Sequence, residues 1–211
     1  QMMENAGRHL ARLAVDRFLG GEPRDKGVVI AAGSGGNGGG GLVAGRWLAN
    51  WGAEVEVHLS RPPQELSGVT SRQLAILQRL DRVSLIPPGQ QMTDAPADVI
   101  LDAVIGYSLE GAPRGAAARL IRGMNQPAAP VLSLDVPSGM DAGTGELFQP
   151  HVTAHATLTL ALPKTGFERE GVQEVVGELY VADIGVPPGL YHRLGLTVGP
   201  LFAAREIRRL Y

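Results

Sequence analysis

The sequence has no cysteine, little excess charge and no long hydrophobic run. Without cysteine the chain can form no disulfide, no thiolate metal site and no cysteine nucleophile. The formal net charge is −2 and there is no basic block, so we expect no nucleic-acid partner. No apolar run approaches the roughly 20 residues that span a bilayer, and no stretch is typical of a signal peptide. We therefore expect no membrane partner and a cytoplasmic location.

The length and composition favour one well-packed domain. At 211 residues and 44% hydrophobic content, the chain can bury a sizeable core. No linker, internal repeat or low-complexity tail divides it, so we predict a single domain over residues 1–211. The chain starts at Gln1 inside a helical pattern, and we therefore expect that its N-terminus is truncated.

Strands and helices alternate along the chain. Strands are predicted where short apolar runs lie between turn residues, and helices where apolar residues recur at helical spacing. The predicted strands are Gly27–Ala32, Ala53–Leu59, Val83–Ile86, Ala97–Val104, Pro130–Leu134, Ala154–Leu162 and Gly177–Val181. The predicted helices are Met2–Phe18, Leu42–Trp51, Ser67–Leu80 and Arg114–Met124. This order predicts an α/β fold with a mostly parallel, doubly wound sheet, in which the late strands extend or fold back on one edge.

A glycine-rich run lies between the first strand and the helix that follows it. Seven of the nine residues from Gly33 to Gly41 are glycine. Glycine lets the backbone approach a ligand closely, and a helix N-terminus offers unpaired N–H groups to an anion such as a phosphate. We therefore predict that this run is a loop that holds a nucleotide-like molecule.

The same run fits the dinucleotide fingerprint Gly-x-Gly-x-x-Gly from Gly33 to Gly38, although so many glycines match such a pattern easily. The fingerprint also requires an acid after the second strand, to bind the ribose hydroxyls. Here Ser60 and Arg61 stand at that point. Because Arg61 could bind a 2′-phosphate instead, an NADP-dependent oxidoreductase stays open as an alternative.

Polar side chains stand at the ends of other predicted strands, where ligands bind in open α/β sheets. Asp102 and Asp135 interrupt or end apolar strands, and a buried carboxylate is unfavourable unless it is paired or binds a cation. Asn37, Asp102 and Ser138 offer hard oxygen ligands with one formal charge, which suit a weakly bound monovalent or hard divalent cation. The structural alternatives are a loop cap at Asp102 and a turn-initiating role at Asp135.

Lys164 follows a predicted strand within the turn Leu162-Pro163-Lys164-Thr165-Gly166. Proline and glycine fix this turn, so we expect a functional lysine at the sheet end, with a solvated surface lysine as the alternative. A serine hydrolase is disfavoured because the sequence has no Gly-x-Ser-x-Gly motif.

Six motifs occur in an order that resembles the YjeF N-terminal domain family, the NAD(P)HX epimerases. They are Met3–Gly7, Gly35–Ala44, Asp102–Gly106, Asp135–Asp141, Lys164–Gly166 and Val181–Pro187. The resemblance implies a Rossmann-like, three-layer α/β/α sandwich. It also implies an isomerase of nicotinamide nucleotide repair, which interconverts the R and S forms of hydrated NADH and NADPH.

The resemblance also implies the site residues. Potassium would be held by Asn37, Asp102 and Ser138. The hydrated coenzyme would contact Asp135 and two backbone segments, which comprise Gly36, Asn37, Gly38, Gly39 and Gly40, and Gly106, Tyr107, Ser108, Leu109, Glu110, Gly111 and Ala112. Because Asp135 and Lys164 stand at neighbouring predicted strand ends beside the proposed ring site, we predict that Asp135 is the catalytic acid and base and that Lys164 is a second proton carrier or its electrostatic partner. We further expect a homodimer and a functional partner, the NAD(P)HX dehydratase, which is fused C-terminally in many bacteria.

The glycine run departs from the family pattern at two positions. The family loop reads Asn-Asn-Gly-Gly-Asp-Gly, so that Gly36 replaces an asparagine and Gly40 replaces an aspartate in this chain. These replacements leave open a non-catalytic binding or scaffold domain with the same fold.

Overall fold

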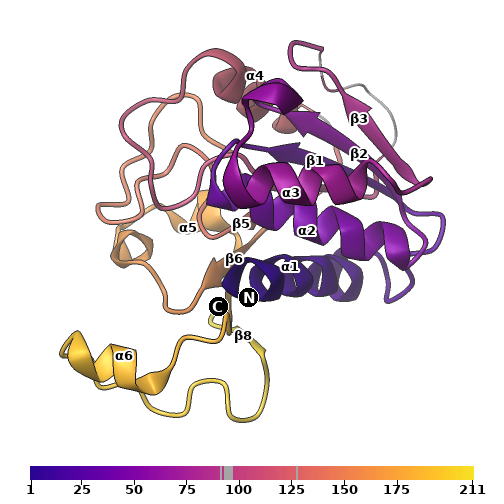
Figure 1. Ribbon diagram of the computed structural model, residues 1–211. Helices are drawn as coiled ribbons and strands as arrows, with labels where there is room; N and C mark the ends of the chain where they lie inside the picture. The colour runs from indigo at the N-terminus through magenta and orange to yellow at the C-terminus, as the bar shows by residue number, and fades with distance from the viewer. Residues whose placement is uncertain (91, 93–96, 127) are drawn as a thin grey trace.

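The computed structural model describes residues 1–90, 92, 97–126 and 128–211. These residues form an eight-stranded sheet with the order β3-β2-β1-β4-β5-β6-β7-β8 (Figure 1). The strands are β1 Gly27–Ala32, β2 Glu54–Leu59, β3 Val83–Ile86, β4 Val99–Ala103, β5 Val131–Leu134, β6 Ala156–Leu160, β7 Glu178–Ala182 and β8 Ile207–Arg209. The helices are α1 Met2–Phe18, α2 Gly36–Asn50, α3 Gly68–Leu77, α4 Gly115–Met124, α5 Gln173–Val176 and α6 Pro188–Arg193, with short 3₁₀ turns η1 Pro63–Glu65 and η2 Thr165–Glu168.

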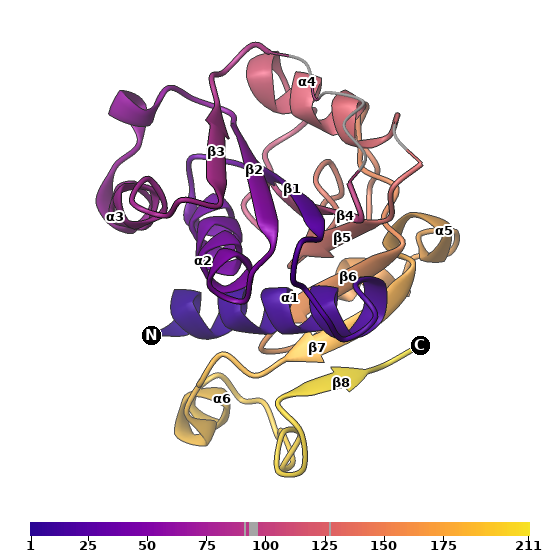
Figure 2. The same cartoon turned by 90° about the vertical axis from the view of Figure 1, so that its right-hand side faces the viewer.

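The predicted α/β class and mostly parallel sheet are confirmed. Strands β1 to β7 pair in parallel, and β8, which the sequence pattern did not reveal, pairs antiparallel with β7 at the edge. Figure 2 shows α2 and α3 on one side of the sheet and α4 and α5 on the other. The strand order runs outward in both directions from the neighbouring pair β1 and β4. A crevice for ligands forms at such a switch point, beyond the carboxyl ends of the strands.

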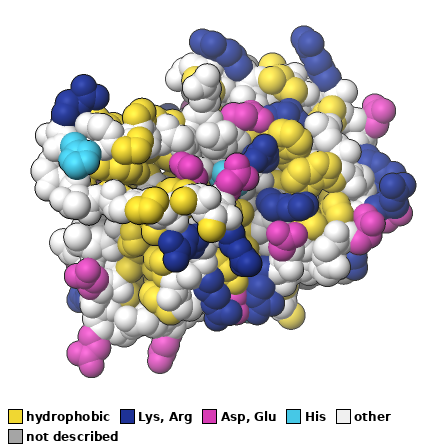
Figure 3. Space-filling model, turned by 90° about the horizontal axis from the view of Figure 1, so that it is seen from below, with side chains coloured by type: hydrophobic (Ala, Val, Ile, Leu, Met, Phe, Trp, Pro, Cys, Tyr) yellow, Lys and Arg dark blue, Asp and Glu magenta, His cyan; other side chains and the backbone are white. Residues whose placement is uncertain are grey.

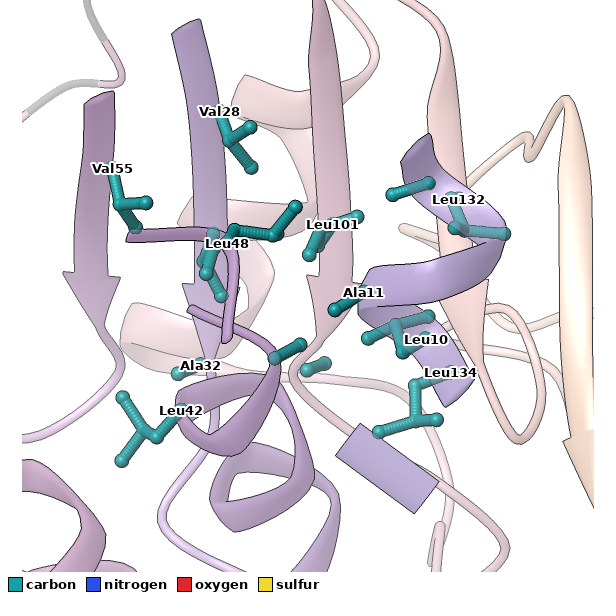
Figure 4. Close-up of a cluster of buried hydrophobic side chains, with 14 of the residues drawn as sticks. Leu10, Ala11, Val28, Ala32, Leu42, Leu48, Val55, Leu101, Leu132 and Leu134 are labelled. Atoms are coloured by element: carbon teal, nitrogen blue, oxygen red, sulfur yellow. The ribbon is translucent and has the colours of Figure 1, made fainter. Parts of the chain in front are cut away.

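The main core lies between the sheet and the helices α1 and α2. Leu10 and Ala11 of α1 are fully buried, as are Leu101 and Leu132 of the central strands, and Leu134 is almost fully buried. Figure 4 shows these side chains grouped between α1 and the strands. Because the central strands are covered on both faces, they consist of nearly continuous apolar residues, and this is why their sequence signal is strong.

Helix α2 begins six residues earlier than predicted, so most of the glycine run is helical and not a loop. Each glycine in a helix costs roughly 1 kcal/mol relative to alanine, but close packing requires glycine here. A Cβ atom on Gly38 would lie 1.8 Å from the carbonyl oxygen of Gly33, and one on Gly41 would lie 2.5 Å from the Cβ of Ala103. The glycines therefore bring the first turns of α2 against the end of the sheet.

Ion pairs connect the N-terminal helix to the far edge of the sheet. The Arg17 guanidinium of α1 donates two hydrogen bonds of 2.9 Å to the Glu178 carboxylate of β7. This guanidinium, against the opposing effect of partial burial, lowers the pKa of Glu178 to about 2.

The face in Figure 3 carries acidic and basic side chains next to one another, with apolar side chains between them. None of the described helices is both long and apolar enough to cross a membrane.

Candidate active site

The N-terminus of α2 opens at the switch point of the sheet. The N–H of Gly33, directly after β1, donates to the Ala103 carbonyl at the end of β4, at 3.0 Å. The chain then turns, and α2 starts after its N-cap residue Gly35, which is exposed like Gly36. The first N–H groups of a helix have no partner within the helix. These exposed glycines therefore present backbone donors where a ligand would lie.

Asp102 follows three apolar residues of β4 and is completely buried. Its carboxylate accepts hydrogen bonds from the Ser138 hydroxyl at 2.5 Å, the Ser138 N–H at 2.8 Å and the Ser133 hydroxyl at 2.8 Å. A weaker bond of 3.3 Å comes from the Val104 N–H. Burial raises the pKa of Asp102, and these hydrogen bonds oppose that rise. The predicted pair of Asp102 and Ser138 is thus in direct contact, and the side chain also caps its own loop.

Asp135 directly follows β5 and has a left-handed backbone, at φ 71°, a conformation that aspartate and asparagine adopt more readily than most residues. The residue is 4% exposed. Its Oδ2 accepts a hydrogen bond of 3.2 Å from the Tyr107 N–H, and the Lys164 ammonium lies 2.7 Å from its Oδ1. That contact falls outside hydrogen-bond geometry, so among the described residues Oδ1 has an ion pair but no hydrogen-bond donor.

The Lys164 ammonium is held firmly in place. It donates to the Thr159 hydroxyl at 3.1 Å and to the carbonyl oxygens of Leu160 at 3.0 Å and Leu162 at 3.2 Å. An ammonium has three donors, and these three acceptors can occupy all of them. The structure therefore places Lys164 beside Asp135 as a fixed positive charge, and the alternative of a solvated surface lysine is wrong.

Asn37 reaches the same region from the first turn of α2. A Cβ atom on Gly106 would lie 3.0 Å from the Asn37 Oδ1 and 3.3 Å from the Asp135 Oδ2, so that Gly106 lies between the two side chains. The preceding residue, Ile105, donates from its N–H to the Ser138 hydroxyl at 2.9 Å. The segment 105–106 therefore joins Asn37 to the cluster of Asp102 and Ser138. Among the described residues, the buried Asn37 Nδ2 has no hydrogen-bond partner.

Two neighbouring cavities open onto Asn37, and one of them also opens onto Asp135. The Asp135 cavity has a volume of about 250 Å³, and Asp135 is the only carboxylate among its described lining residues, which also include Met3, Asn37, Gly40, Gly106, Leu134 and Leu160. The Arg114 cavity has a volume of about 530 Å³ and is lined by Gly33–Asn37, Ser60, Arg61, Val104–Gly106, Ser108 and Arg114–Ala117. Gly36, Asn37, Gly106 and Ser108 line both. The two cavities are therefore adjacent parts of one site.

The predicted substrate residues are placed unequally around this site. Gly38 and Gly39 are buried within α2, and Gly39 packs against Met3, so these two contribute to close packing. In the segment 106–112, Gly106 is buried and Leu109 is partly buried, whereas Tyr107, Ser108, Glu110, Gly111 and Ala112 are exposed. Gly106, Tyr107 and Ser108 line the Asp135 cavity, and the remaining residues of the segment line neither cavity.

Comparison with known proteins places this chain in a family. Residues 1–166 match the family described as YjeF-related protein N-terminus. The chain belongs to this family. The yeast protein ynu0, known from a crystal structure, has the same fold, with a TM-score of 0.83 at 23% identity over 100% of this chain and 89% of its own.

Several relatives at higher identity are enzymes by name. The NAD(P)H-hydrate epimerase of Dehalogenimonas lykanthroporepellens is 47% identical over 93% of this chain and 77% of its own length. The enzyme of the same name in Truepera radiovictrix is 40% identical over 92% of this chain and 84% of its own. The bifunctional NAD(P)H-hydrate repair enzyme Nnr of Moorella thermoacetica is 37% identical, and the match spans only 37% of its length.

Sequence reasoning missed Ser133 as a partner of Asp102 in this YjeF-type site. The two residues are opposite each other in the parallel register of β4 and β5, and Ser133 is fully buried. Its signal in the sequence is a hydroxyl within an otherwise apolar strand, directly before the predicted Asp135 segment. Only the pairing of the strands shows that this hydroxyl serves Asp102.

Proposed function

We propose that this chain is an NAD(P)HX epimerase, which interconverts the R and S forms of hydrated NADH and NADPH. The relatives named as NAD(P)H-hydrate epimerases support this proposal. The observation that carries it is the geometry of Asp135, the only carboxylate among the described residues of its cavity, with Lys164 fixed 2.7 Å away. A single carboxylate at the end of a small, partly apolar cavity is suited to proton transfer at one carbon of a bound ring.

The coenzyme would occupy both cavities. The hydrated nicotinamide ring fits the Asp135 cavity, whose apolar lining includes Leu134 and Leu160. The phosphates would pass Gly36 and Asn37, where the two cavities meet and the first N–H groups of α2 are available. The segment Gly106–Ser108, which also lines this cavity, would contact the ring. In this arrangement the coenzyme contacts those predicted substrate residues that line the cavities.

The reacting carbon carries a hydroxyl group and is bonded to the ring nitrogen, so it is a hemiaminal. Either the nitrogen expels the hydroxyl as water to leave an iminium, or the ring opens at this carbon. Re-addition on the other face completes the inversion, with no net redox change. Expulsion requires a proton on the leaving oxygen, and re-addition requires that a proton be removed. Asp135, which lines the cavity, would perform both transfers through its carboxylate.

Lys164 would act as the electrostatic partner of Asp135. Its three donors already have acceptors. Lys164 is therefore poorly placed to pass a proton to the substrate, but its positive charge is held at a defined position. The ammonium would hold the carboxylate in position and balance the charge change when Asp135 releases or accepts a proton. Of the two predicted roles of Lys164, the contacts support this one.

Potassium would be held by Asn37, Asp102 and Ser138. The donor set fits, because Asp102 is a fully buried carboxylate whose hydrogen-bond donors are all neutral, and a monovalent cation would offset the cost of its burial. No group of three or more histidine, aspartate or glutamate side chains in the described part of the chain could hold a metal ion, so such a cation would rest on one carboxylate. Bound there, it would supply positive charge and order the segment 105–106.

An NAD(P)HX dehydratase would be the functional partner, since it consumes the S form that the epimerase supplies. The match to a bifunctional repair enzyme supports this partnership. The cytoplasmic location and the homodimer stay predictions.

A coupled assay tests the proposed function. The protein is mixed with an R and S mixture of hydrated NADPH and an S-specific dehydratase, and the recovered NADPH is measured by absorbance. An epimerase lets the whole pool recover, whereas the dehydratase alone stops when the S form is used up. Recovery limited to the S fraction at all protein concentrations would favour the non-catalytic alternative. That alternative is suggested by Gly40, which lines the Asp135 cavity and replaces an aspartate of the family loop. A change in absorbance with NADPH and a carbonyl substrate, without dehydratase, would favour the oxidoreductase.

A further inference from the structure

The Arg114 cavity carries positive charge that the proposed reaction does not use. Arg61 and Arg114 both line it, and no carboxylate is among its described lining residues. The Arg114 side chain has no hydrogen bond or ion pair with the described residues, and only its backbone carbonyl accepts a bond, from the Ala118 N–H. Arg61 lies 4.0 Å from Glu65, with both side chains more than half exposed, and such a pair holds a charge only weakly. Two poorly neutralised guanidinium groups beside a cavity attract an anion.

The position of Arg61 indicates which anion it meets. The N–H of Ser60, at the end of β2, donates to the Ala32 carbonyl at the end of β1, at 2.9 Å. This bond fixes Ser60 and Arg61 beside the start of α2. In doubly wound dinucleotide folds, the ribose of the adenosine lies at the end of the second strand, where an acid binds its 2′-hydroxyl and an arginine accommodates a 2′-phosphate.

We propose that Arg61 and Ser60 bind the 2′-phosphate of the coenzyme, and that the site therefore prefers hydrated NADPH to hydrated NADH. Arg114 follows the segment 106–112, whose first residues also line the Asp135 cavity. It binds the phosphates that both coenzymes share. Arg61 is thus a specificity residue and Arg114 a general anchor. This inference rests on the proposed function, because it requires the dinucleotide to lie across the two cavities.

Binding of adenosine nucleotides tests the inference without turnover. We would measure by calorimetry the affinities of the protein for adenosine 2′,5′-bisphosphate and for AMP, which lacks the 2′-phosphate. The wild type is expected to bind the bisphosphate at least about tenfold more tightly, as a charged hydrogen bond warrants. Arg61→Gln should bring the ratio close to one with AMP affinity unchanged, and Arg114→Gln should weaken both ligands by a similar factor. Arg193→Gln, an equal change of charge on α6, outside the lining of both cavities, is the matched control.

The outcomes separate this inference from the proposed function. Equal affinity of the wild type for the two nucleotides, or a ratio that Arg61→Gln leaves unchanged, overturns the inference even if the protein epimerises both hydrates. A preference that Arg193→Gln removes as well as Arg61→Gln overturns it too, because the effect is then one of net charge. A preference lost only in Arg61→Gln supports it, even if the coupled assay finds no epimerisation.

Discussion

Replacement of Asp135 by asparagine tests the chemistry most directly, because asparagine keeps the shape and the backbone of this residue. Asp135 has φ 71°, and asparagine adopts this left-handed conformation as readily as aspartate does. The amide oxygen can still accept the hydrogen bond from the Tyr107 N–H. What is lost is the charge opposite the Lys164 ammonium and the ability to take up and return a proton.

The expected magnitude follows from these losses. General acid and base catalysis contributes roughly 10²- to 10⁴-fold, so we expect kcat to fall by at least about 100-fold, or about 2.7 kcal/mol in the activation barrier. Lys164 keeps its three oxygen acceptors, and at 20% side-chain exposure it can still be partly hydrated. We therefore expect a loss of folding stability of only about 1–2 kcal/mol. Chemistry should suffer more than the fold.

The assay is the coupled recovery of NADPH, measured with a urea unfolding curve of the same preparation. Asp141→Asn serves as the control, because Asp141 lies on the same turn after β5 but does not line the Asp135 cavity. This substitution should lower stability slightly, because a neutral amide oxygen accepts the bonds from the Thr144 N–H and hydroxyl more weakly than a carboxylate does, and it should leave kcat unchanged. A folded Asp135→Asn variant with the wild-type kcat would refute the role of Asp135.

Three further predictions concern the cation, the glycine helix and acid stability. Ser138→Ala should raise the potassium concentration for half-maximal activity by about tenfold. Ser133→Ala, which removes a comparable bond to the Asp102 carboxylate, should leave that concentration unchanged. Equal effects of the two substitutions in a potassium titration would contradict this ligand set. Gly38→Ala should destabilise the fold by several kcal/mol or prevent folding, because its Cβ meets a backbone oxygen at 1.8 Å, while Gly36→Ala, with nothing within 4 Å, should leave the urea midpoint nearly unchanged. Glu178, whose pKa is lowered from 4.5 to about 2, stabilises the fold above pH 4.5, and this contribution is lost as the pH falls toward 2. Glu178→Gln should therefore lower the free energy of unfolding at pH 7 by about 1 kcal/mol, with a difference that disappears near pH 2; a constant difference across that range would show that the charge is not responsible.

The sequence predicted well which segments along the chain are strands and helices, because the signals for these elements are local. Apolar runs such as Gly27–Ala32 need only their own composition to mark a strand buried on both faces. Asp102 and Asp135 stood out because carboxylates in apolar strands are unfavourable unless something receives them. The family likeness followed from motifs read along the chain, and the comparisons confirmed it.

The tertiary structure decided what depends on contacts between distant segments. The low helix propensity of glycine predicts a loop for the glycine run. In the structure the run from Gly36 onward is the start of α2, and it packs closely against Gly33 and Ala103. The ion pair of Lys164 with Asp135 arises because β5 and β6 are adjacent in the sheet, and no spacing in the chain reveals that pairing. Local composition fixes which segments are strands and helices, whereas the distances that make a site are set by how those segments pack.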